Sequence, residues 1–191
     1  AEMILFDLPE NSEPWSMLPA DFDGPPPPDG APNYVIYGKD DAFWGGQDEL
    51  EIWEFTADWD NTLNSTFEPV AALPVEPFDS RLCDAPRNRC IDQPDNAPRL
   101  ESLSDRLMYR LQYRNFGDYQ AMVANHTVDV DGFGHAGIRW YEIRNDNDGM
   151  GWYIYQQGTY SPDEDHRWMG SIAMNGKGDI AVILLLTEDL K

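Results

Sequence analysis

The sequence predicts an all-β fold of antiparallel four-stranded blades, β-propeller-like and most simply an incomplete propeller fragment. Aromatic residues are abundant, with 7 Trp, 9 Tyr and 8 Phe, and 15 Pro and 15 Gly interrupt the chain at short intervals. This composition favours many short strands over long helices. Residues 103–175 also contain four consecutive strand patterns and the beginning of a fifth. Antiparallel strands in a row, followed by a loop into the next unit, are typical of a propeller blade.

Residues 1–73 form the first blade-like unit in this interpretation. Its strands are expected near residues 2–8, 33–38, 49–58 and 65–73. In the third of these, Leu50 and Ile52 alternate with acidic residues, as in a half-buried strand. Residues 9–32 are rich in proline, with four consecutive prolines at 25–28, which neither a helix nor a central strand accommodates. We therefore expect an extended connector there.

Residues 74–103 are expected to form a long irregular loop that contains five prolines and both cysteines. A loop of this length inside a compact domain usually has a function or needs a cross-link. Cys83 and Cys90 are close enough in sequence to close a short loop. If the protein is exported, a disulfide between them is expected; in a reducing compartment they would be two free thiols.

Residues 104–160 are expected to form a complete four-stranded blade. Its strands are predicted at 106–114, 119–129, 136–144 and 152–160. In the first, apolar and polar residues swap at every step, which places one set on a shared face: Leu107, Tyr109, Leu111 and Tyr113. The turn before the last strand, Asn147-x-Gly149-x-x-Trp152, is similar to a degenerate sialidase Asp-box, which occupies the same turn of a blade.

Residues 161–191 are expected to begin a further blade, with a hairpin around residues 175–178. About two and a half blades cannot close a ring, which needs about four. The chain is therefore expected to be a piece of a larger propeller, to assemble with partners, or to be an open or sandwiched all-β domain, and the first of these is favoured.

The formal net charge is −22, and residues 1–60 contain fifteen acidic residues and one basic residue, Lys39. Such a surface repels nucleic acid and anionic membranes, so we expect neither as a partner. No apolar run approaches the roughly 20 residues of a membrane helix, so membrane insertion is not expected. The charge itself is most simply an adaptation for solubility.

Four runs of sequence resemble an uncharacterised family of large exported bacterial proteins. They lie at residues 18–34 (LPADFDGPPPPDGAPNY), 78–83 (FDSRLC), 107–145 and 155–182, so that the resemblance covers about residues 17–182. It implies a propeller-like β architecture and an extracellular or periplasmic address. It implies no established activity and no catalytic residues.

In a propeller blade, the loop between the second and third strands shares one rim with the loop that leaves the fourth. Four loops map to this rim: 39–48, 74–105, 129–135 and 161–167. They contain carboxylates, imidazoles and guanidinium groups that bind cations, sugars or anions. The candidate binding residues are Trp44, Asp105, Arg106, Asp129, His135, Asp163, His166 and Arg167.

Calcium is the one cofactor that the sequence suggests. Asp129-x-Asp131-Gly132 places alternating carboxylates before a glycine, as hard oxygen sites do, although the final bidentate Glu of a twelve-residue loop is missing. Acidic turns are also common in an acidic protein. Asp129 and Asp131 are therefore the candidate metal ligands, with a solvated turn as the simpler alternative.

We expect an exported binding or structural module of unknown ligand, for which a carbohydrate or a protein is considered, and we assign no catalytic residues. Exposed Trp44, Trp59 and Trp168 would suit such contacts. The alternative is a sialidase-like glycoside hydrolase that uses two rim carboxylates. Its arginine cluster would come from Arg106, Arg110 and Arg139, which are more simply interpreted as partners in salt bridges. We also consider that this segment contacts the rest of a longer chain, or other copies of itself in an oligomer.

Overall fold

The computed structural model describes residues 3–8, 16–82 and 89–187, and it confirms the all-β class. One sheet contains two sets of four strands. The first set is β1 (Leu18–Phe22), β2 (Asn33–Lys39), β3 (Glu49–Thr56) and β4 (Thr66–Pro74). The second set is β7 (Leu111–Asn115), β8 (Gln120–Asp129), β9 (Ala136–Asn145) and β10 (Tyr153–Tyr160). Two small sheets are β11 (His166–Met174) with β12 (Ile180–Thr187) and β5 (Arg89–Ile91) with β6 (Leu100–Glu101). Among the described residues, the structure has one short α-helix, α1 (Asp41–Trp44), and 3₁₀ turns that include Thr62–Asn64 and Pro94–Asn96.

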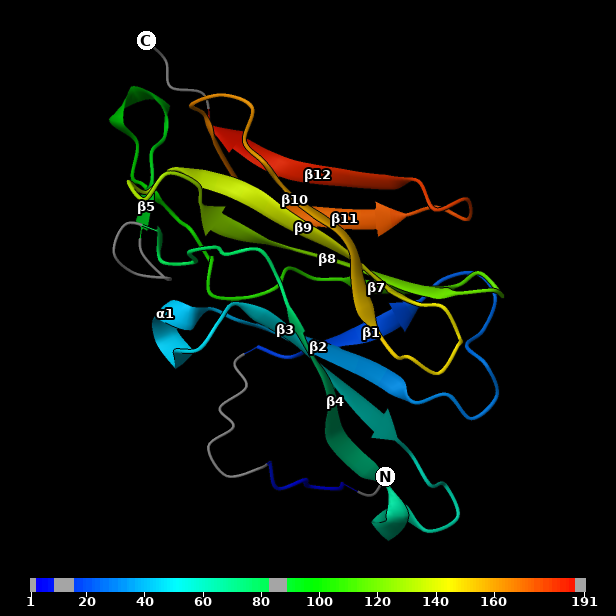
Figure 1. Ribbon diagram of the computed structural model, residues 1–191. Coiled ribbons are helices and arrows are strands. Elements are labelled where there is room, and N and C mark those ends of the chain that lie inside the picture. Colours follow the sequence, from blue (N-terminus) through cyan, green and yellow to red (C-terminus); the bar gives the residue numbers. More distant parts are fainter. Residues whose placement is uncertain (1–2, 9–15, 83–88, 188–191) are drawn as a thin grey trace.

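Each set of four strands is an antiparallel meander, and the two meanders are joined edge to edge. The strand order is β10-β9-β8-β7-β1-β2-β3-β4, and the junction is the parallel pair β1 and β7. The sheet curls so that its two halves face each other across one core (Figure 1). Separate propeller blades are not confirmed, because the two units share backbone hydrogen bonds and form a half-open barrel.

Strand β1 lies within the segment that was expected to be a connector. Leu18 and Pro19 pair with β2, whereas the residues from Ala20 to Phe22 pair with β7. Pro19 has no N–H to donate, and in this arrangement it pairs with a strand on one side only. This division of the short strand explains how a proline is accommodated in the middle of the sheet. Residues 3–8, the described part of the strand expected at 2–8, form no strand.

The main core fills the inner face of the curl. It combines Ile36, Leu50 and Ile52 from the first half with Met122 and Ile143 from the second, all fully buried. Aromatic rings line one end of this core. The ring of Tyr34 lies edge-on to Trp152, with 4.8 Å between centroids, and is stacked on Tyr113 at 6.1 Å.

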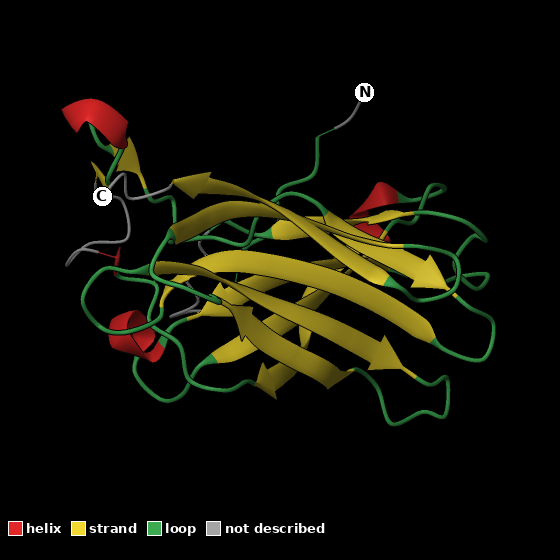
Figure 2. Ribbon diagram, turned by 90° about the horizontal axis from the view of Figure 1, so that it is seen from above, coloured by secondary structure: helices red, strands yellow, loops and turns green. Residues whose placement is uncertain are grey.

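The β11–β12 hairpin covers the outer face of β8 and β9 (Figure 1). Ile172 and Met174 pack there on Ala121 and Val123. The molecule thus has three layers: the hairpin, the second meander and the first meander. In the view from above, strands of different layers cross one another and the short helices lie at the periphery (Figure 2).

The first strand of the second meander is shorter than expected. It begins at Leu111 instead of residue 106, and the preceding chain leaves the ladder, with the Met108 N–H donating to the Asn125 carbonyl at 2.8 Å. Tyr109 is consequently 74% exposed and not on the buried face. The alternating pattern of residues 106–110 therefore does not correspond to a strand. The side chain of Arg110 instead forms an ion pair with Asp23.

The turn that is similar to an Asp-box joins two neighbouring hairpin turns. The Nδ2 of Asn147 donates to the Gly117 carbonyl at 3.1 Å, and its Oδ1 accepts from Gln120. Trp152 is buried in the core. Among the described residues, no helix is long and apolar enough to cross a membrane.

Candidate functional site

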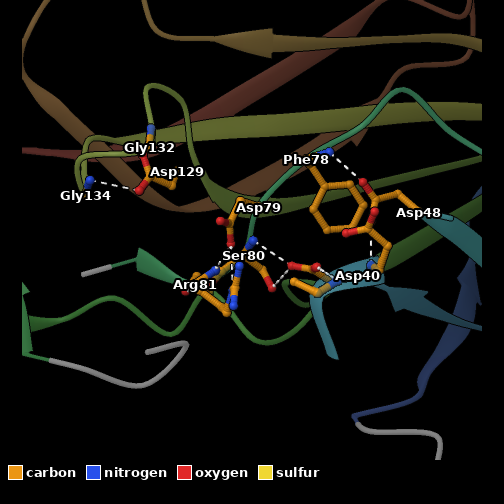
Figure 3. Close-up of polar contacts among 12 residues, drawn as sticks. Asp40, Asp48, Phe78, Asp79, Ser80, Arg81, Asp129, Gly132 and Gly134 are labelled. Carbon is orange, nitrogen blue, oxygen red and sulfur yellow. Dashed lines mark hydrogen bonds and ion pairs between the residues drawn. The ribbon is translucent and has the colours of Figure 1, made fainter. Parts of the chain in front are cut away.

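Several predicted rim loops meet at one end of the molecule. The Asp129 N–H donates to the Asp79 carbonyl at 2.7 Å, and the Ser80 N–H donates to Asp40 Oδ2 at 2.8 Å. The Ser104 hydroxyl donates to the Ser80 carbonyl at 2.5 Å. Figure 3 shows the segment around Asp79 and Ser80 between the α1 loop on one side and the Asp129 loop on the other.

Asp40 and Asp48, which were not among the candidate residues, anchor this network. Both are buried, and all four of their carboxylate oxygens accept hydrogen bonds from backbone N–H groups. Asp48 receives N–H groups from Asp41 and Phe78, each at 2.7 Å. Burial raises the pKa of the Asp48 carboxyl against the opposing effect of these bonds. Carboxylate oxygens of Asp40, Asp41 and Asp48 lie within 4.8 Å of one another, but the buried two serve to hold loops together.

The predicted calcium ligands organise their own loop. Asp129 Oδ1 accepts from the N–H groups of Asp131 and Gly132 at 3.2 and 2.9 Å, and Oδ2 accepts from Gly134 at 2.8 Å. Asp131 Oδ1 accepts from the Phe133 N–H at 2.8 Å, a bond that holds the pKa of Asp131 below its usual value. The carboxylates thus stabilise the turn by local bonds, as aspartates in turns do.

Two histidines and an ion pair link the Asp129 loop to the start of β11. The His135 Nε2 lies 3.1 Å from the Asp165 carbonyl, and His166 Nδ1 accepts from the Ala136 N–H at 3.2 Å. The two imidazole centroids are 5.8 Å apart. Arg167 binds both carboxylate oxygens of Asp163, at 2.6 and 2.7 Å, which lowers the pKa of Asp163. The structure therefore brings together five of the eight candidates: Asp129, His135, Asp163, His166 and Arg167.

The other three candidates form no part of this link. Arg106 is paired in a fork with its neighbour Asp105, at 2.8 and 3.0 Å. Trp44 ends α1 and is partly exposed. Arg139 donates to the Glu76 and Pro77 carbonyls, both at 3.1 Å. The guanidinium groups thus have partners within the fold.

The predicted disulfide involves a residue outside the described part of the chain. Cys83 is not described, so its pairing with Cys90 stays a prediction. Cys90 is buried in a small cluster below the rim loops, whose other members are Leu82, Ile91, Ala136 and Trp168. The expectation that Trp168 is exposed is wrong, because it packs in this cluster.

A second surface, which sequence reasoning missed, lies on the outer face of β10, beside the hairpin that covers β8 and β9. Three tyrosines of β10 are exposed there, with Tyr155 and Tyr160 about half exposed, at 49% and 50%. The indole of Trp140 lies against Gly158 on the opposite strand, and any Cβ there would lie 3.2 Å from Trp140 Nε1. We call this row the aromatic stripe: Trp140, Tyr153, Tyr155 and Tyr160.

The guanidinium group of Arg144 fixes one ring of the aromatic stripe, that of Tyr155. The guanidinium carbon of Arg144 lies 3.4 Å from the ring centroid of Tyr155 and 4.4 Å from that of Tyr119. Beneath it, Glu142 is fully buried and accepts from Arg144 Nε at 2.6 Å and from Gln156 Nε2 at 2.5 Å. A cation held between two rings restricts the orientation of both. The Tyr155 ring is therefore presented in a defined position.

The signal for the aromatic stripe was present as tyrosines at 153, 155 and 160, but strict alternation places 155 and 160 on opposite faces. The register of β10 shifts between Ile154 and Gln156, which returns both tyrosines to the outer face. A bulge of this kind has no clear sequence signature.

An apolar groove of about 220 Å³ also exists beside Phe22, Tyr34 and Tyr113, and no acidic residue lines it.

No protein-family model matches the chain, and neither a curated protein nor a solved structure shows significant similarity to it.

Proposed function

We propose that the protein is a binding module without catalytic activity, which holds an extended neutral glycan along the aromatic stripe. The observation that carries the proposal is a row of partly exposed rings on one sheet face, one of them clamped by Arg144. Rings stack on the apolar faces of sugars, and their positions set the path of the ligand.

The surroundings of the aromatic stripe suit a sugar chain. Exposed Gln156 and the phenolic hydroxyls of Tyr155 and Tyr160 offer hydrogen bonds beside the apolar ring faces. The eight residues of β10 extend over about 26 Å, enough for several sugar rings in a line. A surface of this shape favours a chain lying across it over a small molecule in a pocket.

Charge selects against acidic ligands. The net charge of −22 repels polyanions. The positive charge of Arg144 is matched by Glu142, which it contacts directly, so the aromatic stripe offers no excess of positive charge. A neutral glycan is therefore favoured over an acidic one.

The alternative, a glycoside hydrolase using rim carboxylates, has weaker support. Such an enzyme needs two carboxyl groups that face a substrate across a cleft. Asp129 accepts three N–H groups of its own loop, Asp163 is paired with Arg167 and Asp105 with Arg106. These partners would have to be displaced before any two of the three carboxylates could act on a sugar.

An extracellular or periplasmic address is part of the proposal, on the ground of the resemblance to exported bacterial proteins. A disulfide between Cys83 and Cys90 would suit that address.

Calorimetric titration with neutral hexasaccharides of glucose, mannose and xylose tests the proposal. We expect at least one to bind, and Tyr155→Ala to weaken that binding at least tenfold, because the central stacking surface is lost. Trp59→Ala is the matched control, since this ring is 88% exposed and lies outside the aromatic stripe. Absence of binding by all three, or equal weakening by the control, would contradict the proposal. Hydrolysis of a hexasaccharide during the titration would favour the alternative.

A further inference from the structure

Strand β12 has an unprotected edge. Its eight residues, Ile180–Thr187, include no charged residue and no proline. Along its length it pairs with β11 alone, and no side chain among the described residues is hydrogen-bonded to its outer edge. An edge of this kind offers a row of backbone N–H and carbonyl groups to another strand.

The two edge strands of the main sheet are protected in recognisable ways. Strand β4 contains Glu68 and two prolines, of which Pro69 lies in its middle. Strand β10 has a bulge at Tyr155. These features discourage pairing with a further strand, and β12 has none of them.

The open side of β11 is occupied by side chains of the main sheet. The Met174 carbonyl accepts from Gln112 Nε2 at 3.0 Å and from Arg114 Nε at 2.7 Å. The Met169 N–H donates to the Thr127 hydroxyl at 3.1 Å. The hairpin can therefore extend only on the β12 side.

The outward face of the hairpin is uncharged, which is unusual in so acidic a chain. Ile183 is 78% exposed and Leu185 about half exposed. The neighbouring outward residues are Met169, Ser171, Ala173 and Ala181, all exposed. Contact with a partner would remove these apolar side chains from water, which is favourable. The edge thus offers both hydrogen bonds and an apolar contact.

We propose that β12 pairs antiparallel with β12 of a second copy of this chain, giving the strand order β11-β12-β12-β11. A register that sets Ile183 opposite its counterpart keeps Ala181, Ile183 and Leu185 of both copies on one face, where they contact each other across the new strand pair. The contact is symmetric and uses the same patch twice. Both outer edges of the joined sheet are then capped β11 strands, so assembly ends at two copies.

A second copy is also consistent with the charge distribution. Strand β12 is free of charge, so pairing brings no carboxylates face to face along the strand. The remaining net charge still repels at longer range, and salt at physiological ionic strength screens this repulsion at separations beyond about 8 Å. Dimerisation therefore strengthens with salt, as opposed to an ion-pair interface, which salt weakens. This interface is independent of the aromatic stripe and of the glycan proposal.

Sedimentation equilibrium of the full chain at low and high salt tests the interface. We expect a monomer–dimer equilibrium that shifts toward dimer as salt is added. Ile183→Lys places a charge at the centre of the contact and is expected to weaken dimerisation at least tenfold. Leu63→Lys is the control, because Leu63 is 86% exposed in the β3–β4 turn, against 78% for Ile183. Circular dichroism of both variants establishes that they remain folded.

A cysteine variant tests the register directly. Directly opposite residues of an antiparallel pair have Cα atoms about 4.5–5.5 Å apart, a separation that a disulfide spans. Ile183→Cys is therefore expected to form a covalent dimer on mild oxidation, whereas Leu63→Cys does not. A wild-type chain that stays monomeric at high salt and millimolar concentration overturns the proposal. So does a dimer that survives Ile183→Lys, or an open series of larger oligomers.

Discussion

The Nε2 atom of His126 lies 2.9 Å from the phenolic oxygen of Tyr141, and both side chains are buried in the core. The two rings are stacked with 5.7 Å between centroids, and Phe78 closes the site edge-on to the imidazole at 4.6 Å. Burial, helped by the nearby Arg139, lowers the pKa of His126 to about 3. The same burial raises the pKa of Tyr141. This pair is neutral and part of the scaffold.

Stability is therefore expected to fall as the pH is lowered from about 6.5 toward 3. In this window the unfolded chain binds a proton at His126 that the folded chain excludes, so acid favours unfolding. The loss by pH 4.5 is on the order of 2 kcal/mol. His126→Gln keeps a polar partner for Tyr141 and does not titrate. Urea unfolding at pH 7 and pH 4.5 should show a smaller difference for this variant than for the wild type. An equal difference would contradict the assignment.

At Gly170 the backbone of the hairpin lies close to the main sheet. A Cβ at this position would overlap Oδ1 of the fully buried Asn125, whose amide atoms have no hydrogen-bond partner among the described residues. Gly170→Ala is expected to destabilise the fold by about 1–3 kcal/mol through overpacking. Gly176→Ala is the control, since nothing lies within 4 Å of its Cβ position. Urea midpoints measure both, and a Gly170→Ala midpoint as high as that of the control would contradict the close contact.

Much of the strand layout could be predicted from the sequence because the pattern is local. The strands expected at 33–38, 49–58 and 136–144 correspond to β2, β3 and β9, where the composition and bounding turns carry the signal. Pairing between distant segments was not accessible. The parallel contact of Ala20 with Leu111 decides between a blade pair and a single curled sheet, and no local pattern encodes it.

The candidate site shows the same limit. The grouping of His135, Asp163 and Arg167 at one rim could be predicted, because the loops follow strands of known direction. The hydrogen-bond and ion-pair partners of these side chains could not be predicted. The roles of Asp40 and Ser80 depend on a hydrogen bond across forty residues, and the position of Tyr155 depends on a bulge.

The acidic α1 loop is expected to be a structural anchor that needs no cation. Asp40→Ala removes the acceptor of both the Ser80 N–H and its hydroxyl, so the folded state should lose about 2 kcal/mol. Asp41→Ala, at the exposed member of the same cluster, should change stability by less than about 0.5 kcal/mol. Thermal unfolding measures both effects.

Calcium is expected to leave the melting temperature unchanged, because the two carboxylate oxygens of Asp129 already accept three N–H groups of the loop. Melting curves with excess calcium and with a chelator measure this. A rise with calcium that Asp129→Asn abolishes, and that Asp41→Ala does not, would instead establish the loop as a calcium site.

Glu142 is expected to support the aromatic stripe without touching a ligand. It is fully buried and bonds to both Arg144 and Gln156, so Glu142→Ala leaves the guanidinium without its counter-charge. Removal of one partner from a buried ion pair lowers the free energy of unfolding by about 3–5 kcal/mol. We expect a smaller loss here, because Arg144 is partly exposed. The released Arg144 no longer fixes the Tyr155 ring, so binding of the neutral hexasaccharide should weaken as well. Glu68→Ala, on the surface of β4, should leave stability and binding unchanged. Loss of stability with full retention of binding would show that the clamp on Tyr155 is not needed for recognition.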